Sequence, residues 1–329
     1  MSWRVAAAIA VLVVLAALGG GLAIGTLARP APTPIRVSIT PSPTITPSPT
    51  PADPAVLLRQ PVSAACATTD AVWIVTNGGG ILRYDGTSWA QVDNTLRSLT
   101  AVACTPDGVF AVGLVGSVVL ADEVARQIHS TDVTVEDLHG VAPLGDGALM
   151  VGSRGAVFIL AGGDIQPFAQ GIDENLWGVV GFTQSSAWAV GEGGVTYRLD
   201  QRGWQSIASG QEKTLRALAA TTPANAVAVG DEGTVLRYDG GWKAVASGVT
   251  TALRAIIVEP ALWIAGDHGT LLTGTPAALH PVDLRTECDL VSVFRQGSEI
   301  WVLGSAPAGG GGLWRLGGDG TIQQHWGGC

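Results

Sequence analysis

The chain has 329 residues, of which 47% are hydrophobic and 14% are charged, and its formal net charge is −9. Lys213 and Lys243 are its only lysines and basic runs are absent, so the composition argues against a nucleic-acid partner. The four cysteines show no Cys-x-x-Cys spacing and no neighbouring histidine in ligand register. We therefore expect no zinc site, no other metal and no cofactor.

The first element along the chain is an uncharged apolar stretch of 24 residues, from Val5 to Ala28, which Arg4 and Arg29 flank. A helix of that length spans about 36 Å, more than the roughly 30 Å of a bilayer core. We therefore expect residues 1–29 to hold an uncleaved transmembrane anchor. The alternative is a cleaved signal peptide, for which Thr-Leu-Ala before Arg29 is an acceptable cleavage site.

A proline-rich segment follows. Nine of the chain's 18 prolines lie between Pro30 and Pro54, mixed with serine and threonine. This composition cannot bury a core and favours extended polyproline II. Residues 30–60 are therefore predicted to be a linker that holds the rest of the chain outside the cytoplasm, on a membrane if the anchor is kept and secreted if it is cleaved.

Residues 61–329 form a sequence repeat. In each copy a small anchor residue closes an apolar run before a short turn, and successive anchors lie 37, 39, 39, 39, 36 and 38 positions apart. The anchors are Thr76, Gly113, Gly152, Gly191, Gly230, Gly266 and Gly304. Each copy holds four short runs rich in Val, Ile, Leu and Trp between Gly, Pro, Asn or Asp, a pattern that is typical of strands.

Four strands in each of seven copies predict an all-β fold, a seven-bladed β-propeller. A β-solenoid usually repeats over fewer residues, and the Gly-His and Trp-Asp signatures of WD40 propellers are absent. We expect the run typified by residues 215–220 to be innermost, and the segments led by Trp89, Trp204 and Trp242 to be outermost. Four second-strand tryptophans should pack between blades: Trp73, Trp188, Trp263 and Trp301.

An even number of cysteines in an exported domain suggests disulfides, and sequence alone allows three pairings. Cys66 and Cys104 each lie at the end of an innermost strand in adjacent blades, so they could pair. The final residue, Cys329, could then reach Cys288 at the start of the last blade and pin the ring closed.

Catalytic patterns are weak. The five histidines are scattered over different copies, and no serine lies in a Gly-x-Ser-x-Gly elbow. Four acids occupy equivalent turns and could converge as a carboxylate pair would: Glu192, Asp231, Glu232 and Asp267. Their alternative role is that of ordinary polar residues in exposed turns. We expect no catalytic residue.

A binding site is predicted where the innermost strands begin. The residue after the leading position of each innermost strand gives seven equivalent positions, namely Ser63, Thr100, His139, Trp177, Arg216, Arg254 and Val291. Four consecutive blades thus place His139, Trp177, Arg216 and Arg254 around one mouth of the channel, and Arg and Trp dominate binding hot spots. The turns on the same face add Arg154, Glu192, Asp231, Glu232, Asp267 and His268. The alternative is that long polar side chains fill the mouth because the core cannot take them.

The repeated phrases AVGEGGVTYRLDQRGW (189–204) and AVGDEGTVLRYDGGW (228–242) resemble blades of the photosystem II stability/assembly factor-like propellers, which are related to the sialidase-like, Asp-box (BNR) propellers. The resemblance covers residues 61–329. It implies an exported, non-enzymatic assembly, binding or scaffold propeller. The arginines at the channel mouth favour a protein or peptide carrying carboxylates as the ligand, with an acidic glycan second. The sialidase-like branch leaves an extracellular polymer-active hydrolase or lyase as the alternative, although no sialidase active site maps onto these residues.

Overall fold

A computed structural model of the chain describes residues 35–36, 53–106, 108–122, 128–169, 171–306 and 309–329. The predicted anchor, residues 1–29, lies outside the described residues, as does most of the predicted linker. Within the described ranges, no helix is long and apolar enough to cross a membrane.

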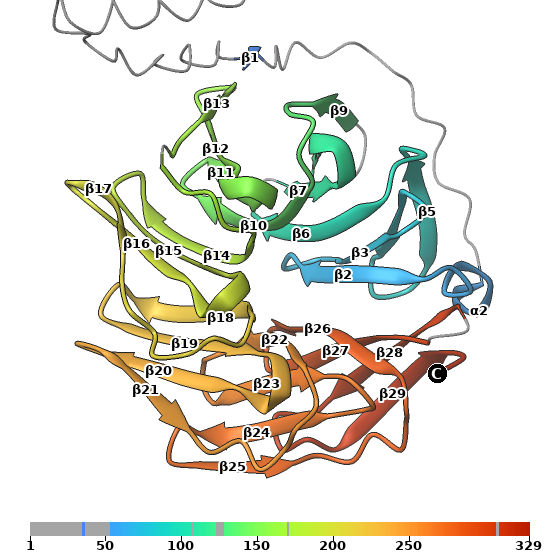
Figure 1. The fold of residues 1–329 in the computed structure, drawn as a ribbon. Coiled ribbons are helices and arrows are strands. Elements are labelled where there is room, and N and C mark those ends of the chain that lie inside the picture. Colours follow the sequence, from blue (N-terminus) through green and yellow to red (C-terminus); the bar gives the residue numbers. More distant parts are fainter. Residues whose placement is uncertain (1–34, 37–52, 107, 123–127, 170, 307–308) are drawn as a thin grey trace, which may run out of the picture. The chain divides into compact units, whose positions relative to one another are not determined.

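Seven antiparallel sheets follow one another along the chain and form a ring (Figure 1). Each sheet is built from one continuous repeat, so the predicted all-β, seven-bladed propeller is confirmed. Blade 1 comprises β2 (Val62–Ala67), β3 (Val72–Thr76), β4 (Gly80–Tyr84) and β5 (Trp89–Asn94), and blade 2 comprises β6 (Leu99–Thr105), β7 (Gly108–Gly113), β8 (Ser117–Asp122) and β9 (Ile128–Asp132). Blade 3 comprises β10 (Leu138–Leu144), β11 (Gly147–Gly152), β12 (Val157–Ala161) and β13 (Asp164–Pro167), and blade 4 comprises β14 (Leu176–Thr183), β15 (Ser186–Gly191), β16 (Thr196–Asp200) and β17 (Gly203–Ser206).

Blade 5 comprises β18 (Leu215–Thr222), β19 (Asn225–Gly230), β20 (Val235–Asp239) and β21 (Trp242–Val245). Blade 6 comprises β22 (Leu253–Ile257), β23 (Leu262–Gly266), β24 (Leu271–Thr275) and β25 (Ala278–Pro281). Blade 7 comprises β26 (Asp289–Gln296), β27 (Glu299–Ser305), β28 (Gly311–Leu316) and β29 (Ile322–Gly327). A short strand, β1 (Ile35–Arg36), pairs with β13. A short helix, α2 (Pro54–Leu57), precedes blade 1.

The first strand of every blade is innermost, as predicted. β2, β6, β10, β14, β18, β22 and β26 surround the centre of the ring in Figure 1, and each contacts the first strand of the next blade. The segments led by Trp89 and Trp242 form the outermost strands β5 and β21, and Trp204 lies in the outermost β17.

At five anchors, a neighbouring backbone segment lies so close that only glycine fits: Gly113, Gly152, Gly191, Gly230 and Gly266. Gly230 is extended, with φ −169°, and a Cβ added there would lie 2.0 Å from the carbonyl oxygen of Thr214. The glycine that closes the same turn, Gly233, instead has φ +68°. The first position therefore excludes any side chain by space, and the second favours glycine by backbone conformation.

Apolar clusters lie between neighbouring blades, where they join the inner strands of one blade to those of the next. Trp73, Trp188, Trp263 and Trp301 are at most 2% exposed. Trp73, for example, packs in one cluster with Val109 and Ala111 of the next blade. The prediction that these tryptophans pack between blades is confirmed.

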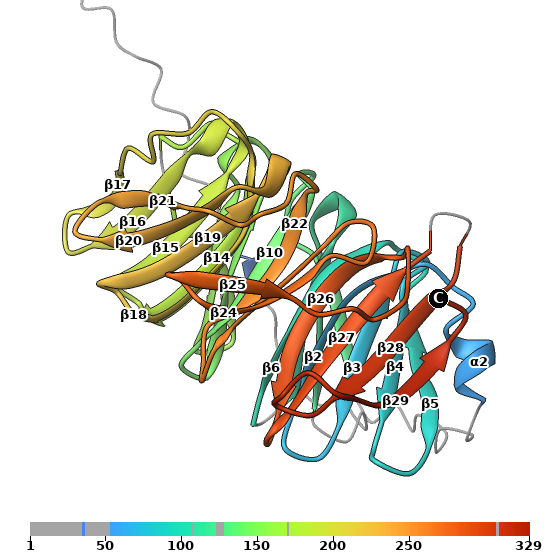
Figure 2. The same cartoon turned by 90° about the horizontal axis from the view of Figure 1, so that it is seen from below.

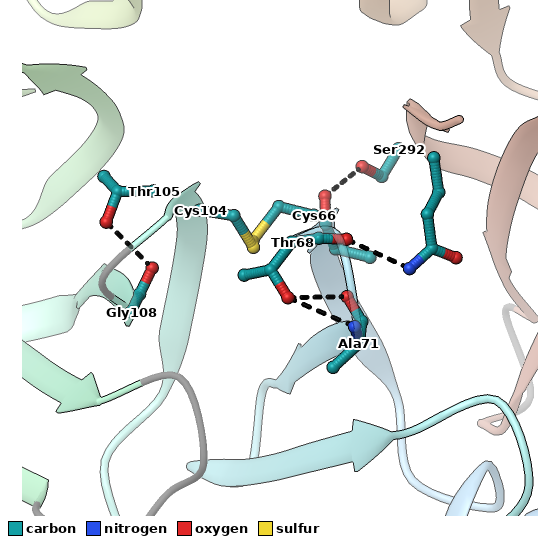
Figure 3. The surroundings of a disulfide bond; sticks show 9 residues. Cys66, Thr68, Ala71, Cys104, Thr105, Gly108 and Ser292 are labelled. Atoms are coloured by element: carbon teal, nitrogen blue, oxygen red, sulfur yellow. Dashed lines mark hydrogen bonds between the residues drawn. A yellow bond between two sulfur atoms is a disulfide. The ribbon is translucent and has the colours of Figure 1, made fainter. Parts of the chain in front are cut away.

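Both predicted disulfides are present. Cys66 of β2 bonds Cys104 of β6, with their Cα atoms 5.7 Å apart, and so links blades 1 and 2 near the centre of the ring (Figure 3). Cys288 bonds Cys329 with a Cα separation of 5.9 Å. Because both ends of this second bond belong to blade 7, it does not cross the junction between blades 7 and 1. The expectation that it pins the ring closed is therefore wrong.

The ring closes instead through the segment before blade 1, although the sequence places this segment in the linker. Helix α2 lies beside β5 and β29 (Figure 2). Leu57 and Leu58 are buried with Trp301 and Leu313 of blade 7, and the amide of Gly311 donates to the carbonyl of Leu58. Two further hydrogen bonds cross the same junction: Ser292 Oγ to the Ala65 carbonyl and Gln296 Nε2 to the Thr68 carbonyl, both 3.0 Å.

Candidate functional site

A β-bulge recurs at the start of the innermost strand in all seven blades. In blade 5, Leu215 pairs with Gly230 and Ala217 pairs with Val229, so Arg216 is the extra residue. In the other six blades the same register shift leaves one residue of the first strand without a partner in the second strand, namely Ser63, Thr100, His139, Trp177, Arg254 and Val291. These are the seven positions that the sequence aligned, and a bulge is a recognised means of re-aiming a side chain at a site.

The bulged residues lie next to the Gly-x-x-Gly turns on one face of the ring, which we call the turn face. His139 Nε2 lies 2.9 Å from Ser153 Oγ, which belongs to the turn of its own blade. Ser63 makes the equivalent contact with Asn77 Oδ1, at 2.5 Å. The bulge and the turn of each of these blades therefore form one unit.

Arg216 and Arg254 make the same contact as fork-shaped ion pairs. Arg216 donates from Nε and Nη2 to the two carboxylate oxygens of Asp231, the Nη2 distance being 3.1 Å. Arg254 donates in the same way to Asp267, with Nη2 at 3.0 Å. Bidentate pairing fixes the plane of each guanidinium and leaves its other N–H donors unused in these pairs.

Ring contacts extend the row across two more blades. The rings of His139 and Trp177 stack with centroids 4.2 Å apart and planes inclined by 19°. Arg216 Cζ lies 5.7 Å from the centroid of the Trp177 ring, within the range of a cation–π interaction. We call the row His139, Trp177, Arg216 and Arg254 the turn-face arc.

Electrostatics differ along the turn-face arc. Burial lowers the pKa of His139, an effect that the charge of Asp137 only partly offsets, so the neutral form of the ring is favoured. At the other end, the hydrogen bonds that Arg254 donates to Asp267 raise the pKa of Arg254, with smaller contributions from the charges of Asp289 and Asp231.

The remaining predicted residues lie on the turn face outside the turn-face arc. Arg154 forms an ion pair with Glu136 and is largely exposed. Glu192 accepts from Asn175 Nδ2 at 2.7 Å. His268 has φ +55°, and its backbone amide donates to Asp289. The equivalent bulges in blades 1, 2 and 7 carry only Ser63, Thr100 and Val291, so the long side chains gather on one side of the face.

Each of the four turn acids has a side-chain partner. Asp231 and Asp267 accept from arginines, Glu232 forms an ion pair with Lys213, and Glu192 is held by Asn175. Within the described residues, no group of three or more His, Cys, Asp or Glu side chains could hold a metal ion. The arrangement offers planar donors, carboxylate acceptors and aromatic faces, which suit recognition of a polar ligand.

Two pockets lie away from the turn-face arc, and the sequence pointed to neither. One, of about 390 Å³, lies between blades 5 and 6 and is lined by Arg237, Tyr238 and the cis Glu259-Pro260 segment. The other, of about 380 Å³, lies between the outer strands of blades 1 and 7, where Tyr84, Trp89 and Trp326 form an aromatic group. The cross-strand pair Tyr84–Trp89 recurs in blade 5 as Tyr238–Trp242, and this recurrence was the available signal for the second pocket.

Comparison with known proteins supports the fold. No family model matches the chain. Immune protein Tsi7 of Pseudomonas aeruginosa is 36% identical over 97 residues, which cover 29% of this chain and 31% of that protein, so the chain matches less than a third of the relative's length.

Solved propellers resemble the chain over most of its length. The WD40 β-propeller domain of Doa1 superposes with a TM-score of 0.66 at 14% identity, over 78% of this chain and 92% of that one. YCF48 bound to D1 peptide gives 0.61 at 14% identity, over 78% and 93%. The extracellular domain of BT4673 from B. thetaiotaomicron gives 0.61 at 14% identity, over 86% of this chain and 40% of that one. At these identities the likeness concerns the fold alone.

Proposed function

We propose that the ring is a non-enzymatic binding or scaffold module that recognises a protein or peptide through its turn-face arc. The observation that carries the proposal is the row of contacts from His139 through Trp177 to the Arg216–Asp231 pair, which the equivalent Arg254–Asp267 pair follows in the next blade. Four adjacent blades contribute to it, and each side chain is placed by the same bulge. A row fixed in this way loses little side-chain entropy when a ligand binds.

The ligand we favour is a polypeptide that offers carboxylates or backbone carbonyls to the unused guanidinium donors. An acidic glycan is second, because the stacked His139–Trp177 pair also suits a sugar ring. Since each arginine already faces an aspartate, recognition rests on the direction of the donors more than on net positive charge. Among the fold neighbours, one was solved with a peptide bound, which is consistent with this use of a propeller.

We further propose that the ring, residues 61–329 together with the closing segment 53–60, works outside the cytoplasm. Residues 1–29 would anchor it in a membrane, and residues 30–52 would act as a spacer. Two disulfides support an oxidising compartment. A protease that shaves intact cells should release the ring if it is displayed on the outside.

The test of recognition compares two double variants in pull-downs of cell-surface proteins, followed by titration of each purified hit. Arg216→Ala with Arg254→Ala should abolish capture. Arg202→Ala with Arg237→Ala, which removes two arginines of the outer strands and loops, should leave capture intact. Unchanged capture by the first variant, in protein shown by circular dichroism to be folded, would place the site elsewhere.

A variant with unchanged net charge distinguishes direct contact between Arg216 and the ligand from long-range attraction by the charge of the whole chain. Arg216→Ala with Asp231→Ala removes one whole ion pair and leaves the net charge unchanged. A loss of binding of about tenfold is expected if the guanidinium contacts the ligand.

A further inference from the structure

Four large aliphatic side chains are exposed together on the turn face. Leu96 is 84% exposed, Val135 79%, Val115 47% and Leu114 37%. Leu114 and Val115 form the Gly-x-x-Gly turn of blade 2, whereas Leu96 and Val135 lie in the connections before blades 2 and 3. We call these four residues the blade 2 patch.

Backbone contacts hold the three segments side by side. The amide of Leu114 donates to the carbonyl of Ser98, two residues after Leu96. The amide of Val115 donates to Asp137 Oδ1 at 2.8 Å, and the amide of Val133 donates to the Gly116 carbonyl. The three segments therefore lie next to one another on the turn face, and the connection from Val135 leads directly to His139, the first residue of the turn-face arc.

The repeat supplies an internal reference for these positions. In blades 3, 5 and 6 the two turn positions are Ser-Arg, Asp-Glu and Asp-His, and the remaining Gly-x-x-Gly turn, in blade 4, has Glu-Gly. Val135, three residues before the leading leucine of its blade, is matched by Asp173, Glu212, Thr250 and Glu287 in blades 4 to 7. Leu96 is matched by Gly171, Gly210 and Gly248, because each has a positive φ and the carbonyl of the next residue lies against the last glycine of the preceding turn. Aliphatic side chains at these positions are therefore a local feature of the sector around blade 2.

Two of the patch residues also have an unfavourable backbone conformation. Val115 has φ +54° and Leu96 has φ +58°. A β-branched residue in this region is an outlier, and strained residues concentrate at functional sites. Glycine fills the equivalent turn position in blade 4, so the fold itself does not demand valine.

We propose that the blade 2 patch is the apolar part of the interface whose polar part is the turn-face arc. Its occupant is a polypeptide segment with two or more aliphatic side chains next to polar or acidic groups. The inference rests on the proposed function and deepens it. Four side chains are too few for a separate protein interface, which needs roughly 800 Å² on each partner, so a ligand of the patch would also have to use the neighbouring arc.

The charges around the patch favour a protein over a lipid surface. Two arginines lie near the patch, and each is paired with an acid. Arg97 forms an ion pair with Asp132 at 2.8 Å, and Arg154 forms one with Glu136, so neither contributes an unbalanced positive charge. The chain as a whole carries −9. Anionic membranes attract clusters of unpaired basic residues, and this surface lacks that character.

The test uses a phage-displayed library of random twelve-residue peptides, selected against the full chain. Enriched peptides are synthesised and titrated against variants. Leu96→Asn with Val115→Asn should weaken binding by at least about tenfold. The same variant should keep or raise the melting temperature, because asparagine tolerates positive φ better than leucine or valine. A loss of affinity without a loss of stability excludes misfolding as its cause.

The matched control is Gly171→Asn with Gly193→Asn, which places asparagine at the equivalent positive-φ positions of blade 4 and of the connection before it. It should leave the affinity unchanged. The enriched peptides should carry neighbouring aliphatic residues, and Arg216→Ala with Arg254→Ala should weaken them too.

Other outcomes overturn one claim or both. Peptides that lose affinity in the arginine variant but not in the patch variant would disprove the inference and leave the proposed function standing. Peptides that depend on the patch but not on the arginines would disprove the shared interface. Failure to enrich any peptide would count against both. If the unmodified chain sediments with phosphatidylcholine vesicles and the patch variant does not, the patch binds lipid instead.

Discussion

At the scale of single residues, the bulge makes the site. A regular strand would alternate its side chains between the two sides of the sheet, where they meet neighbouring blades. The extra residue of the bulge escapes this alternation, so Arg216 and Arg254 reach the aspartates of their own turns. Polar groups are thereby kept out of the clusters between blades, while the flanking Leu215 and Leu253 remain fully buried.

Replacement of an anchor glycine tests the packing of these turns. Gly230→Ala should lower the free energy of unfolding by about 1–3 kcal/mol, because the new Cβ would meet the Thr214 carbonyl at 2.0 Å. Gly241→Ala is the control, since nothing lies within 4 Å of its Cβ position and its φ is not positive. Urea unfolding of both variants should show a loss for the first only.

Titration of His139 should couple pH to stability. Burial depresses its pKa in the folded ring, so the unfolded chain binds the proton more tightly. The free energy of unfolding must then fall as pH falls from 7.5 to 5.5, by at most about 1.4 kcal/mol per pH unit for one group. His139→Phe keeps a ring against Trp177 and should flatten this dependence.

The control for that measurement is His280→Phe, an exposed histidine of β25. Its pH dependence should match that of the unmodified chain. Parallel curves for all three proteins would show that His139 does not carry the effect.

At the scale of elements, the sequence predicts most of the blade. The spacing of anchor residues is a one-dimensional record of the repeat, so blade number, strand order and the turn face all follow from it. The buried tryptophans follow as well, because their position in the second strand is the same in four blades. The alignment of the repeats picks out the seven positions that are bulged, but it does not show that the strand is bulged there.

What the sequence could not predict are contacts between elements of different repeats. The stacking of His139 on Trp177 depends on the distance between two bulges in adjacent blades, which no period reports. The sequence placed Arg216 and Asp231 on the same face of the ring. That placement made their ion pair possible, but it did not establish that the two side chains are in contact. Helix α2 was missed because residues 53–60 continue a proline-rich segment and lie outside the repeat.

The Cys66–Cys104 disulfide joins two innermost strands separated by 38 residues. Replacing both cysteines with serine should lower the free energy of unfolding by about 3–4 kcal/mol in the chain-entropy model. The change is measured by denaturant unfolding, with native mass confirming that Cys288–Cys329 remains oxidised. An equal stability of both proteins would mean that the unfolded chain is already compact around this loop.

At the scale of the whole molecule, the junction of blades 7 and 1 differs from the other six. Elsewhere the chain itself runs from one blade into the next, so each junction is covalent. Blades 7 and 1 are joined through packing of β26 on β2, hydrogen bonds and the segment 53–60. No strand is exchanged across this junction, because both blades are complete in their own repeats.

Leu58 is the residue through which this closure can be tested. It is 1% exposed, and its carbonyl accepts from the amide of Gly311 in blade 7. Leu58→Ala leaves that backbone bond but removes buried apolar contacts, so we expect a loss of about 2–4 kcal/mol. Val56→Ala, an exposed position in the preceding helix α2, should change stability by less than about 0.5 kcal/mol.

Hydrogen exchange then locates the effect. If the ring opens at this junction, Leu58→Ala should raise exchange first in β2, β26 and β29, while the amides of blades 3 to 5 keep their protection. A uniform rise in all seven blades would instead mean that the ring unfolds as one cooperative unit. In that case the closing segment would contribute to global stability without forming a separate gate, and the junction would be no weaker than the six covalent ones.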